Sequence, residues 1–521
     1  MGQMNETLRN VALAAHGGAG KTSLAEIMIY KAGMTTRIGR VEDGNTVMDF
    51  EPEELKRQAS LSSGFFQLPW KKHTISLIDT PGDQNFISDA KLCMQAAEVA
   101  LILVDAVDGV KVQTEQVAEF AAEYDMPCAI FINKLDRDGM SPLDVMGDIE
   151  DKLQIECAPL SWPIGMGKRF RGIYNLHRRQ LHLFVAGGKP HDQEGLTIRD
   201  LADPQLDELL GSQADDLRED VELLEGAANP FELEAYLKGS QTPVFFGSAI
   251  NNFGVRELLD AFVAMAPAPQ PRPAVTRVVD PEEEAFSGFA FKIQANMDPA
   301  HRDRIAFVRI CSGKFERGMK VFQTRLDKQV TLSNATIFMA QDRTHVDEAY
   351  PGDIIGIHNH GTISIGDTFC EKERLSFTGI PSFAPDHFRR VQLKSPLKAK
   401  QLLKGLVQLA EEGAVQFFRP LAGNAYILGA VGVLQFDVTM ARLKAEYGVD
   451  AVYEPVSFAA ARWITSDDKK QLEAFEKDRH GSLAHDSQGK LTFLASSLWR
   501  LENAMEEWPA IRFHKTRELA A

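Results

Sequence analysis

The sequence has few cysteines. Only five occur in 521 residues, and no two of them form a CxxC pair. Each stands in an apolar or strand-like context, which favours buried free thiols over disulfides or metal ligands. These residues are Cys93, Cys128, Cys157, Cys311 and Cys370.

The sequence also lacks long hydrophobic runs. The longest, such as Val99–Val104, are far shorter than the roughly 20 apolar residues that span a bilayer. The segment Met1–Asn10 is polar and has neither a cationic start followed by an apolar stretch nor a cleavage site. We therefore expect neither secretion nor a membrane partner, and a cytoplasmic location.

Positive charge is in deficit, with a formal net charge of −16. Residues 191–240 hold 14 acidic and 3 basic side chains, a local charge of −11, so the other 471 residues carry only −5. This acidic segment is either a solvated helical insert or a docking surface for a basic partner. The weakly charged remainder does not exclude contact with nucleic acid.

The length predicts three or four domains, at about 150 residues per domain. In the first 135 residues short apolar strands alternate with helical patterns, and a further strand is expected at Pro243–Gly247. Such buried runs between helices predict a doubly wound α/β domain with a parallel sheet. Four prolines in Ala266–Pro273 predict an extended linker at its end.

Two further domains are expected after this linker. Short alternating strands with glycine-bearing turns, from about Phe286 to Cys370, predict an antiparallel β-barrel. The strand and helix patterns of 388–453, with Ser395 as the N-cap of the first helix, follow the β-α-β-β-α-β order of a ferredoxin-like α+β domain. The expected boundaries are 1–272, 273–384 and 385–521, the last domain including a C-terminal extension, and no internal repeat is apparent.

A phosphate-binding loop follows the first strand. Its glycines let backbone N–H groups turn toward phosphate oxygens, Lys21 reaches the β- and γ-phosphates, and the Thr22 hydroxyl binds Mg²⁺. Ala15 replaces the first glycine of the general pattern, while the more crowded positions remain glycine. The loop consists of Ala15, His16, Gly17, Gly18, Ala19, Gly20, Lys21 and Thr22.

Two more motifs end strands of the same domain. Asp79, Thr80, Pro81 and Gly82 follow the strand Thr74–Ile78, so Asp79 can hold a Mg²⁺ ligand and the Gly82 amide can sense the γ-phosphate. Asn133, Lys134 and Asp136 follow Ala129–Ile132. A carboxylate at Asp136 accepts two hydrogen bonds from guanine that adenine cannot donate, which favours GTP over ATP. Ser248 and Ala249 fit the remaining guanine-contacting loop.

These motifs, in this order, resemble those of the translational GTPases, and four downstream segments resemble the bacterial class II release factors (peptide chain release factor 3). The resemblance covers about residues 130–460. It implies a GTP-binding domain, a barrel and an α/β domain, and an activity in which GTP drives class I release factors off the ribosome after peptide release. The segments are Gly165–Tyr174, Gly288–Val321, Glu411–Gln416 and Gly429–Phe436.

The first 135 residues resemble a different branch. Gly39–Thr46 and Asp79–Phe86 are more similar to elongation factor G and its divergent paralogues. Natural divergence, ancient recombination and an engineered or computed hybrid all fit this mosaic. An elongation factor G-like GTPase is therefore the alternative function, although the chain ends about 70 residues after the last family-like strand, where that family continues with further domains.

Two positions depart from the family pattern. Asp83 stands where most translational GTPases have a histidine that orients the attacking water, and its carboxylate adds repulsion near the γ-phosphate. We assign Asp83, Lys21 and Gly82 to the catalytic step. A further alternative function is that of a nucleotide-gated ribosome-binding protein that hydrolyses little GTP. Gly18 replaces the usual loop aspartate, which removes a cation ligand.

The resemblance also implies the remaining ligands and partners. The first switch segment is expected within Glu51–Gly64, with Ser60 joining Thr22 and Asp79 as a Mg²⁺ ligand, or as a plain solvent-facing serine. GTP or GDP with Mg²⁺ is the expected cofactor set. The ribosome and class I release factors are the expected partners, with no DNA and a monomeric chain. Basic residues around the first helix of the third domain are either a solvated face or contacts to ribosomal RNA, namely Arg389, Arg390, Lys394, Lys398, Lys400 and Lys404.

Overall fold

The computed structural model describes residues 6–183, 196–198, 200–227, 229–295, 304–333, 335–339 and 342–519. The chain divides into two compact units. Unit 1 holds residues 1–83, 93–270 and 338–344, and unit 2 holds 84–92, 271–337 and 345–521. Within the described residues, no helix combines the length and apolarity needed to cross a membrane.

Unit 1 is built on a seven-stranded sheet. Its order is β2-β3-β1-β4-β5-β11-β6, in which only the β2–β3 pair is antiparallel. The predicted doubly wound α/β domain with a parallel sheet is thereby confirmed. The strands are β1 (Leu8–Ala14), β2 (Gly64–Trp70), β3 (His73–Asp79), β4 (Val99–Asp105), β5 (Cys128–Asn133), β6 (Cys157–Pro159) and β11 (Thr242–Phe246).

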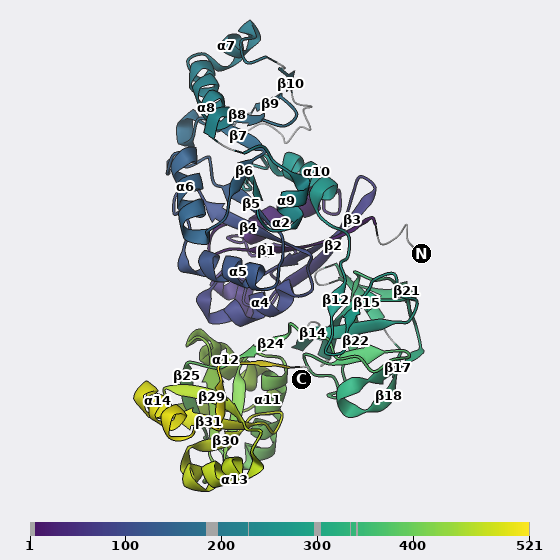
Figure 1. Cartoon of the computed structure of the whole chain (residues 1–521), viewed down its shortest axis with the longest axis vertical. Coiled ribbons are helices and arrows are strands. Elements are labelled where there is room, and N and C mark those ends of the chain that lie inside the picture. The colour runs from purple at the N-terminus through teal and green to yellow at the C-terminus, as the bar shows by residue number, and fades with distance from the viewer. Residues whose placement is uncertain are drawn as a thin grey trace. The chain divides into compact units, whose positions relative to one another are not determined.

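Helices cover both faces of this sheet. One face packs on α2 and α10, whose apolar side chains share a core with β1, β3, β4 and β5. Figure 1 shows α5 and α6 along the other side. Burial of both faces explains why the central strands are continuous apolar runs rather than alternating ones. The helices are α2 (Lys21–Lys31), α3 (Pro52–Arg57), α5 (Val112–Glu123), α6 (Pro142–Leu153), α9 (Leu233–Leu237) and α10 (Val255–Met265).

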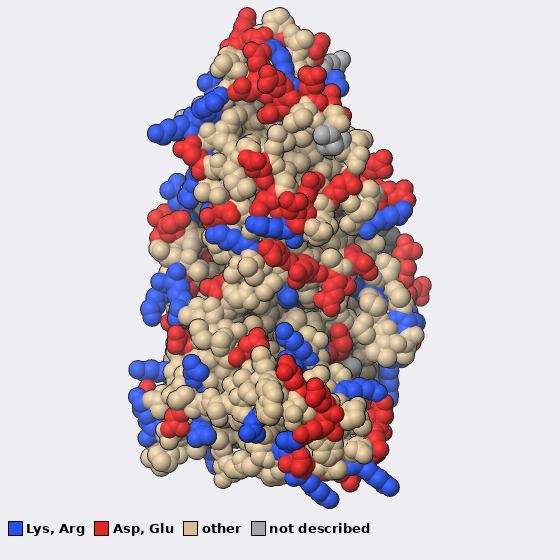
Figure 2. All heavy atoms as spheres, turned by 60° about the vertical axis from the view of Figure 1, so that its left-hand side comes forward, with Lys and Arg blue, Asp and Glu red and all other residues tan. Residues whose placement is uncertain are grey.

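The acidic segment belongs to a small subdomain of unit 1. Two helices, α7 (Pro204–Leu210) and α8 (Gln213–Ala227), accompany a four-stranded antiparallel sheet in the order β10-β9-β8-β7. Figure 2 shows acidic side chains gathered over the part of the molecule that holds α7 and α8 in Figure 1. Whether a basic partner docks there stays a prediction. The strands are β7 (Ser161–Ile164), β8 (Gly172–Asn175), β9 (Gln180–Leu183) and β10 (Leu196–Thr197).

Unit 2 begins with an antiparallel sheet, ordered β18-β17-β23-β14-β15-β22-β19, which forms a half barrel. This confirms the predicted antiparallel domain. Glycines with positive φ, such as Gly313 and Gly366, lie in its tight turns, where a side chain would be strained. The strands of this region are β12 (Arg272–Pro273), β13 (Val278–Val279), β14 (Ser287–Ala295), β15 (Arg304–Ser312), β16 (Phe315–Glu316), β17 (Met319–Gln323), β18 (Lys328–Leu332), β21 (Glu348–Ala349), β22 (Ile354–His358) and β23 (Thr368–Cys370).

Three elements run across the division between the units. They are α4 (Ile87–Met94), β19 (Ala335–Met339) and β20 (Asp342–Val346).

The predicted ferredoxin-like order β-α-β-β-α-β is present after residue 386, with strands in the order β28-β25-β27-β26. One detail of the prediction is wrong. Pro396–Lys398 form a 3₁₀ turn, the α-helix begins only at Ala399, and the Ser395 side chain makes no capping hydrogen bond. The elements are β25 (His387–Leu393), α11 (Ala399–Glu411), β26 (Gln416–Pro420), β27 (Tyr426–Ala430), α12 (Leu434–Tyr447) and β28 (Ala451–Pro455).

The C-terminal extension repeats this plan, which the sequence analysis missed. Its strands are ordered β30-β31-β29-β32, and β26 pairs with β30, so that one eight-stranded sheet spans both halves. Phe475 and Phe493 lie in its separate core. The elements are β29 (Ala460–Thr465), α13 (Lys469–Asp478), β30 (Leu483–His485), β31 (Leu491–Ala495), α14 (Leu498–Glu507) and β32 (Arg512–His514), with β24 (Pro381–Phe383) and β33 (Thr516–Glu518) paired beside them.

Candidate functional site

The predicted phosphate loop joins β1 to α2. Gly18 and Gly20 have φ values of 82° and 99°, which only glycine adopts without strain. The loop ends at Lys21, the first residue of an 11-residue helix, so the unpaired amides at the start of α2 and the positive end of its dipole face the loop. This is the local geometry of an anion site.

Lys21 is buried at the centre of the loop. Its side chain is folded back, and Nζ lies 3.1 Å from the His16 carbonyl oxygen and 3.4 Å from that of Ala15. Burial lowers the pKa of Lys21 to about 8, and the carboxylates of Asp79 and Asp49 oppose this shift. A buried ammonium in such surroundings gains from an anionic ligand such as a phosphate.

The motif that begins at Asp79 lies against this loop. Thr80 fixes its path, because its hydroxyl donates to the Leu13 carbonyl over 2.6 Å. A Cβ added at Gly82 would lie 2.2 Å from Lys21 Nζ and 2.7 Å from the His16 carbonyl oxygen. Glycine is therefore required here by space, and the Gly82 backbone is close to the lysine of the phosphate loop.

Gly82→Ala is expected to weaken guanine nucleotide binding at least tenfold, because the added methyl group displaces Lys21 or moves the chain away from the loop. Titration with a fluorescent GDP analogue measures this effect. Gly147→Ala is the matched control, since its Cβ would meet no atom within 4 Å. Equal affinity of Gly82→Ala and the unmodified chain would contradict the assignment.

The three predicted metal ligands come together. Thr22 Oγ1 lies 3.1 Å from Ser60 Oγ. Asp79 is 1% exposed, and neither of its carboxylate oxygens has a hydrogen-bond partner among the described residues. Burial, and then the Asp49 carboxylate, raise the pKa of Asp79 to about 7, whereas the Lys21 ammonium and the nearby Thr22 hydroxyl oppose this shift.

This arrangement fits Mg²⁺. The ion prefers oxygen ligands in an octahedron with bonds of about 2.0–2.1 Å, which places neighbouring ligand atoms about 3 Å apart. The Thr22 and Ser60 hydroxyls have that spacing. Buried carboxylate oxygens without partners are costly, and a cation or its bound water would satisfy them. Thr22 and Ser60 would ligate the ion, and Asp79 would hold it directly or through water.

Asp49 is a residue of this site that the sequence analysis missed. It is 5% exposed, and its Oδ2 has no hydrogen-bond partner among the described residues. Burial raises its pKa, while the Ser60 hydroxyl and the Lys21 ammonium oppose the shift. The only sequence signal was an acidic residue between Met48 and Phe50, and nothing in its spacing points to the phosphate loop.

Two buried carboxylates shape the segment that carries Asp49 and Ser60. Glu26 accepts hydrogen bonds from the amides of residues 47 and 48, at 2.6 and 3.1 Å. Glu54 accepts from the amides of residues 51, 61 and 62, at 3.2, 3.0 and 3.2 Å. Burial raises the pKa of both side chains. These backbone contacts explain how an irregular segment places Ser60 beside Thr22.

Asn133 links the predicted guanine motif to the phosphate loop. Its Nδ2 donates to the Ala19 carbonyl over 2.8 Å, and its Oδ1 accepts from the Ala249 amide at 2.9 Å. A Cβ at Gly20 would lie 2.4 Å from that Nδ2, so glycine is required here as well. Asn133 thus joins three of the four predicted motifs.

Asp136 and Ser248 meet beside Asn133. Ser248 Oγ donates to Asp136 Oδ1 over 2.5 Å, and Asn251 Nδ2 donates to the same Ser248 hydroxyl over 2.8 Å. Lys134 has a φ of 69°, and its Nζ pairs with Asp105 Oδ2 at 2.5 Å. The end of β5 therefore presents a positioned carboxylate with a hydroxyl beside it.

The remaining predicted residues are less defined in role. His16 is 2% exposed, and its Nδ1 lies 3.2 Å from Thr114 Oγ1. Burial, and then the lysines Lys111 and Lys21, lower the pKa of His16 to about 4, so its imidazole is neutral. Asp83 is half-buried next to Gly82. Its catalytic role, like the ligand roles of the other site residues, stays a prediction.

Three family models match the chain in succession. Residues 6–268 match the elongation factor Tu GTP binding domain, and residues 285–372 match elongation factor G domain 2. Residues 377–505 match the C-terminal domain of the class II release factor RF3. These matches follow the order of the GTP-binding domain, the half barrel and the α+β region.

The fold is also similar to a solved structure, that of ttk003000868 from Thermus thermophilus. The TM-score is 0.71, with 23% sequence identity, over 89% of this chain and 71% of the other. At this identity the likeness concerns the fold alone. With half of its length matched by one model, the chain belongs to the elongation factor Tu GTP binding domain family, and its C-terminal region is similar to that of the class II release factor RF3.

Proposed function

We propose that the chain is a ribosome-dependent GTPase of translation termination, which promotes dissociation of class I release factors after peptide release. The observation that carries this proposal is the match of residues 377–505 to the RF3 C-terminal domain in one chain with a GTP-binding domain. The proposal includes Mg²⁺ as cofactor, a monomeric chain and a cytoplasmic location.

The residues of unit 1 support this proposal. The loop amides and Lys21 would bind the β- and γ-phosphates, and the Gly82 amide would respond to the γ-phosphate. Thr22, Ser60 and Asp79 would hold Mg²⁺, with Asp49 close by. Asp136 would accept the two guanine hydrogen bonds once the base displaces the Ser248 hydroxyl from Oδ1.

The decisive experiment measures loss of a fluorescently labelled class I release factor from post-termination ribosomes. The protein with GTP is expected to accelerate dissociation, whereas the protein with GDP, or GTP alone, leaves the rate unchanged. If GTP and protein together have no effect, the proposed function is wrong.

An elongation factor G-like activity is the second candidate. It is favoured by the match of residues 285–372 to elongation factor G domain 2. A translocation assay on programmed ribosomes separates the two candidates, because the termination function predicts no movement of messenger RNA.

Asp83 favours a third candidate, a ribosome-binding protein with little hydrolysis. Asp83→His is expected to raise ribosome-stimulated phosphate release at least tenfold, because it removes a carboxylate near the γ-phosphate and supplies a neutral donor. Single-turnover phosphate release with and without ribosomes measures this. Rapid turnover by the unmodified chain would eliminate the candidate, and Asp83→Asn distinguishes charge removal from a specific effect of histidine.

The basic face around α11 is proposed to contact ribosomal RNA. Lys398, Lys400 and Lys404 are all exposed. Replacing all three by alanine is expected to weaken ribosome binding. It should also make the fall of log affinity with log salt shallower, by about 2 to 3 in slope, since each phosphate contact releases counterions. The matched control replaces three exposed lysines of α13, Lys469, Lys470 and Lys477. An equal effect of both triple variants would contradict a specific contact.

A further inference from the structure

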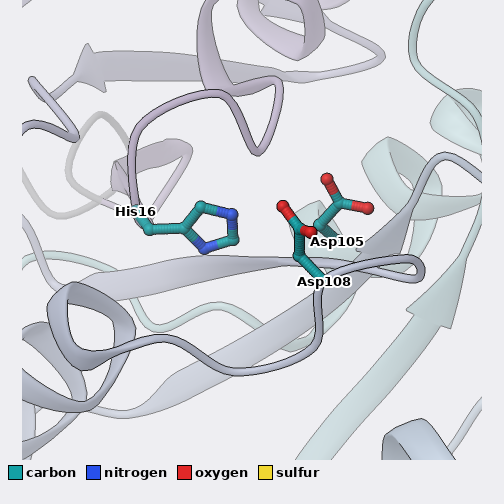
Figure 3. Close-up of side chains that lie close together, drawn as sticks. All are labelled: His16, Asp105 and Asp108. Carbon is teal, nitrogen blue, oxygen red and sulfur yellow. The ribbon is translucent and has the colours of Figure 1, made fainter. Parts of the chain in front are cut away.

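Three side chains of unit 1, His16, Asp105 and Asp108, form a cluster distinct from the predicted Mg²⁺ ligands (Figure 3). His16 comes from the phosphate loop, Asp105 ends β4, and Asp108 lies in the turn that follows. One potential ligand atom from each side chain lies within 4.8 Å of the other two. Ligand atoms around a single cation are about 3 to 3.5 Å apart, so small side-chain rotations suffice to bring all three to one ion.

The imidazole of His16 points to a ligand at this cluster. Its Nδ1 is occupied by the contact with Thr114 Oγ1, whereas its buried Nε2 has no hydrogen-bond partner among the described residues. Figure 3 shows one ring nitrogen facing the two carboxylates and the other turned away from them. A hydrogen bond at the second nitrogen is what usually orients a metal-ligating histidine. The unpartnered Nε2 would be satisfied by an ion.

The two carboxylates differ in accessibility. Asp105 is 2% exposed, and its oxygens accept from the Val107 amide at 2.9 Å and from Lys134 at 2.5 Å. Asp108 is exposed, and its Oδ2 pairs with Lys111 at 2.6 Å. The exposed carboxylate gives an ion access from solvent.

A cation has to compete with the two lysines for the carboxylates. Lys111 is 44% exposed and can swing into water at small cost, because exposed ion pairs contribute about 1 kcal/mol or less. Lys134 can stay in place, since each oxygen of Asp105 has a second lone pair. Binding of one dication is therefore compatible with the charges around the cluster.

We propose that His16, Asp105 and Asp108 form a second cation site, which binds a transition-metal dication of the Zn²⁺ type. The imidazole ligand selects against Mg²⁺ and Ca²⁺, which prefer oxygen-only sites. One nitrogen and two carboxylate oxygens, with water at the remaining position, match an open zinc site. The ion would tie the wall of the phosphate loop to the turn after β4.

The test is calorimetric titration of the full chain with Zn²⁺, in GDP and millimolar Mg²⁺ so that the nucleotide site is filled, together with Co²⁺ absorption spectra. One equivalent is expected to bind with a micromolar or lower dissociation constant. His16→Gln and Asp108→Asn are each expected to weaken binding at least tenfold. His480→Gln, which removes an exposed histidine of unit 2, is the matched control and leaves the affinity unchanged.

Absence of stoichiometric Zn²⁺ binding, or equal affinity of Asp108→Asn and the unmodified chain, would overturn the proposal. Asp108 is exposed, so its variant is expected to fold, and it decides the question should His16→Gln prove unstable. Loss of binding in His480→Gln would place the ion elsewhere and also overturn the site.

Discussion

Replacing Asp79 by asparagine is expected to stabilise the nucleotide-free protein at pH 8 while abolishing the dependence of nucleotide affinity on Mg²⁺. Both effects follow from one carboxylate that is 1% exposed and has no hydrogen-bond partner among the described residues at either oxygen. The amide keeps the shape of the side chain and removes its charge. It also loses the ability to hold a divalent cation or its water.

The sign of the pH dependence follows from the raised pKa. Burial raises the pKa of Asp79 from 3.8 to about 7, so the protonated side chain is the form that the fold favours. The stability that it contributes in this form is complete below about pH 4 and is lost as pH rises through 7. A pKa difference of one between the folded and unfolded states corresponds to about 1.4 kcal/mol of stability. Because Lys21 loses an attractive partner in the variant, part of this gain is offset. The free energy of unfolding is therefore expected to rise by a net of roughly 1–3 kcal/mol at pH 8.

Urea unfolding of the nucleotide-free protein at pH 5 and pH 8 tests the stability effect, and the advantage of Asp79→Asn should be larger at pH 8. Mg²⁺ titration of GDP binding tests the ligand role. Asp151→Asn is the control, because Asp151 is an exposed aspartate of α6 and the variant removes the same charge from a side chain that is not buried. A less stable Asp79→Asn variant at pH 8, or one with an unchanged response to Mg²⁺, would refute this account.

Asp136→Asn is expected to lower GTP affinity by at least about 100-fold and to create affinity for xanthosine triphosphate. Guanine presents N1–H and a 2-amino group, two donors that a carboxylate accepts together. In the variant an amide donor faces one of these donors and leaves it unpaired. Xanthine presents a carbonyl at that position, which accepts from the asparagine amide.

Competition titrations with GTP, xanthosine triphosphate and ATP measure the exchange of specificity. Asp151→Asn again serves as the charge-matched control. Equal loss of affinity for GTP and for xanthosine triphosphate would indicate general damage to the site, since Asp136 also accepts a hydrogen bond from the Ser248 hydroxyl. Unchanged GTP affinity would remove Asp136 from the base site. If Asp136→Asn binds xanthosine triphosphate, release factor dissociation can be measured with that nucleotide in place of GTP. This tests whether dissociation depends on the nucleotide bound to this chain.

Local sequence signals located much of the fold. Three strand predictions lie within one residue of the observed ends of β3, β5 and β11, namely Thr74–Ile78, Ala129–Ile132 and Pro243–Gly247. Strands buried on both faces have little choice of residue, so their apolar runs are easy to locate. Gly448 ends α12 in the left-handed conformation, which glycine adopts without strain. The prediction that Ser395 caps the helix was wrong because a side-chain cap depends on hydrogen-bond geometry, which the sequence does not give.

The second ferredoxin-like half was missed for a related reason. Its helices do have local start signals, since Asp468 and Ser497 accept hydrogen bonds from the first turns of α13 and α14. Its strands are short, and their pairing is long-range, as in β26 with β30. Pairing between strands far apart in the chain depends on a packed core, which no local window contains.

By itself, the sequence determined that this chain has a phosphate loop, a guanine motif and three regions of different architecture, because each depends on residues adjacent in the chain. Only the tertiary structure placed Ser60 beside Thr22 and brought Asp49 to Asp79. It also set the His16 imidazole against Asp105 and Asp108. The physical reason is that buried carboxylates such as Glu26 and Glu54 fix irregular backbone through hydrogen bonds whose partners are not set by sequence spacing.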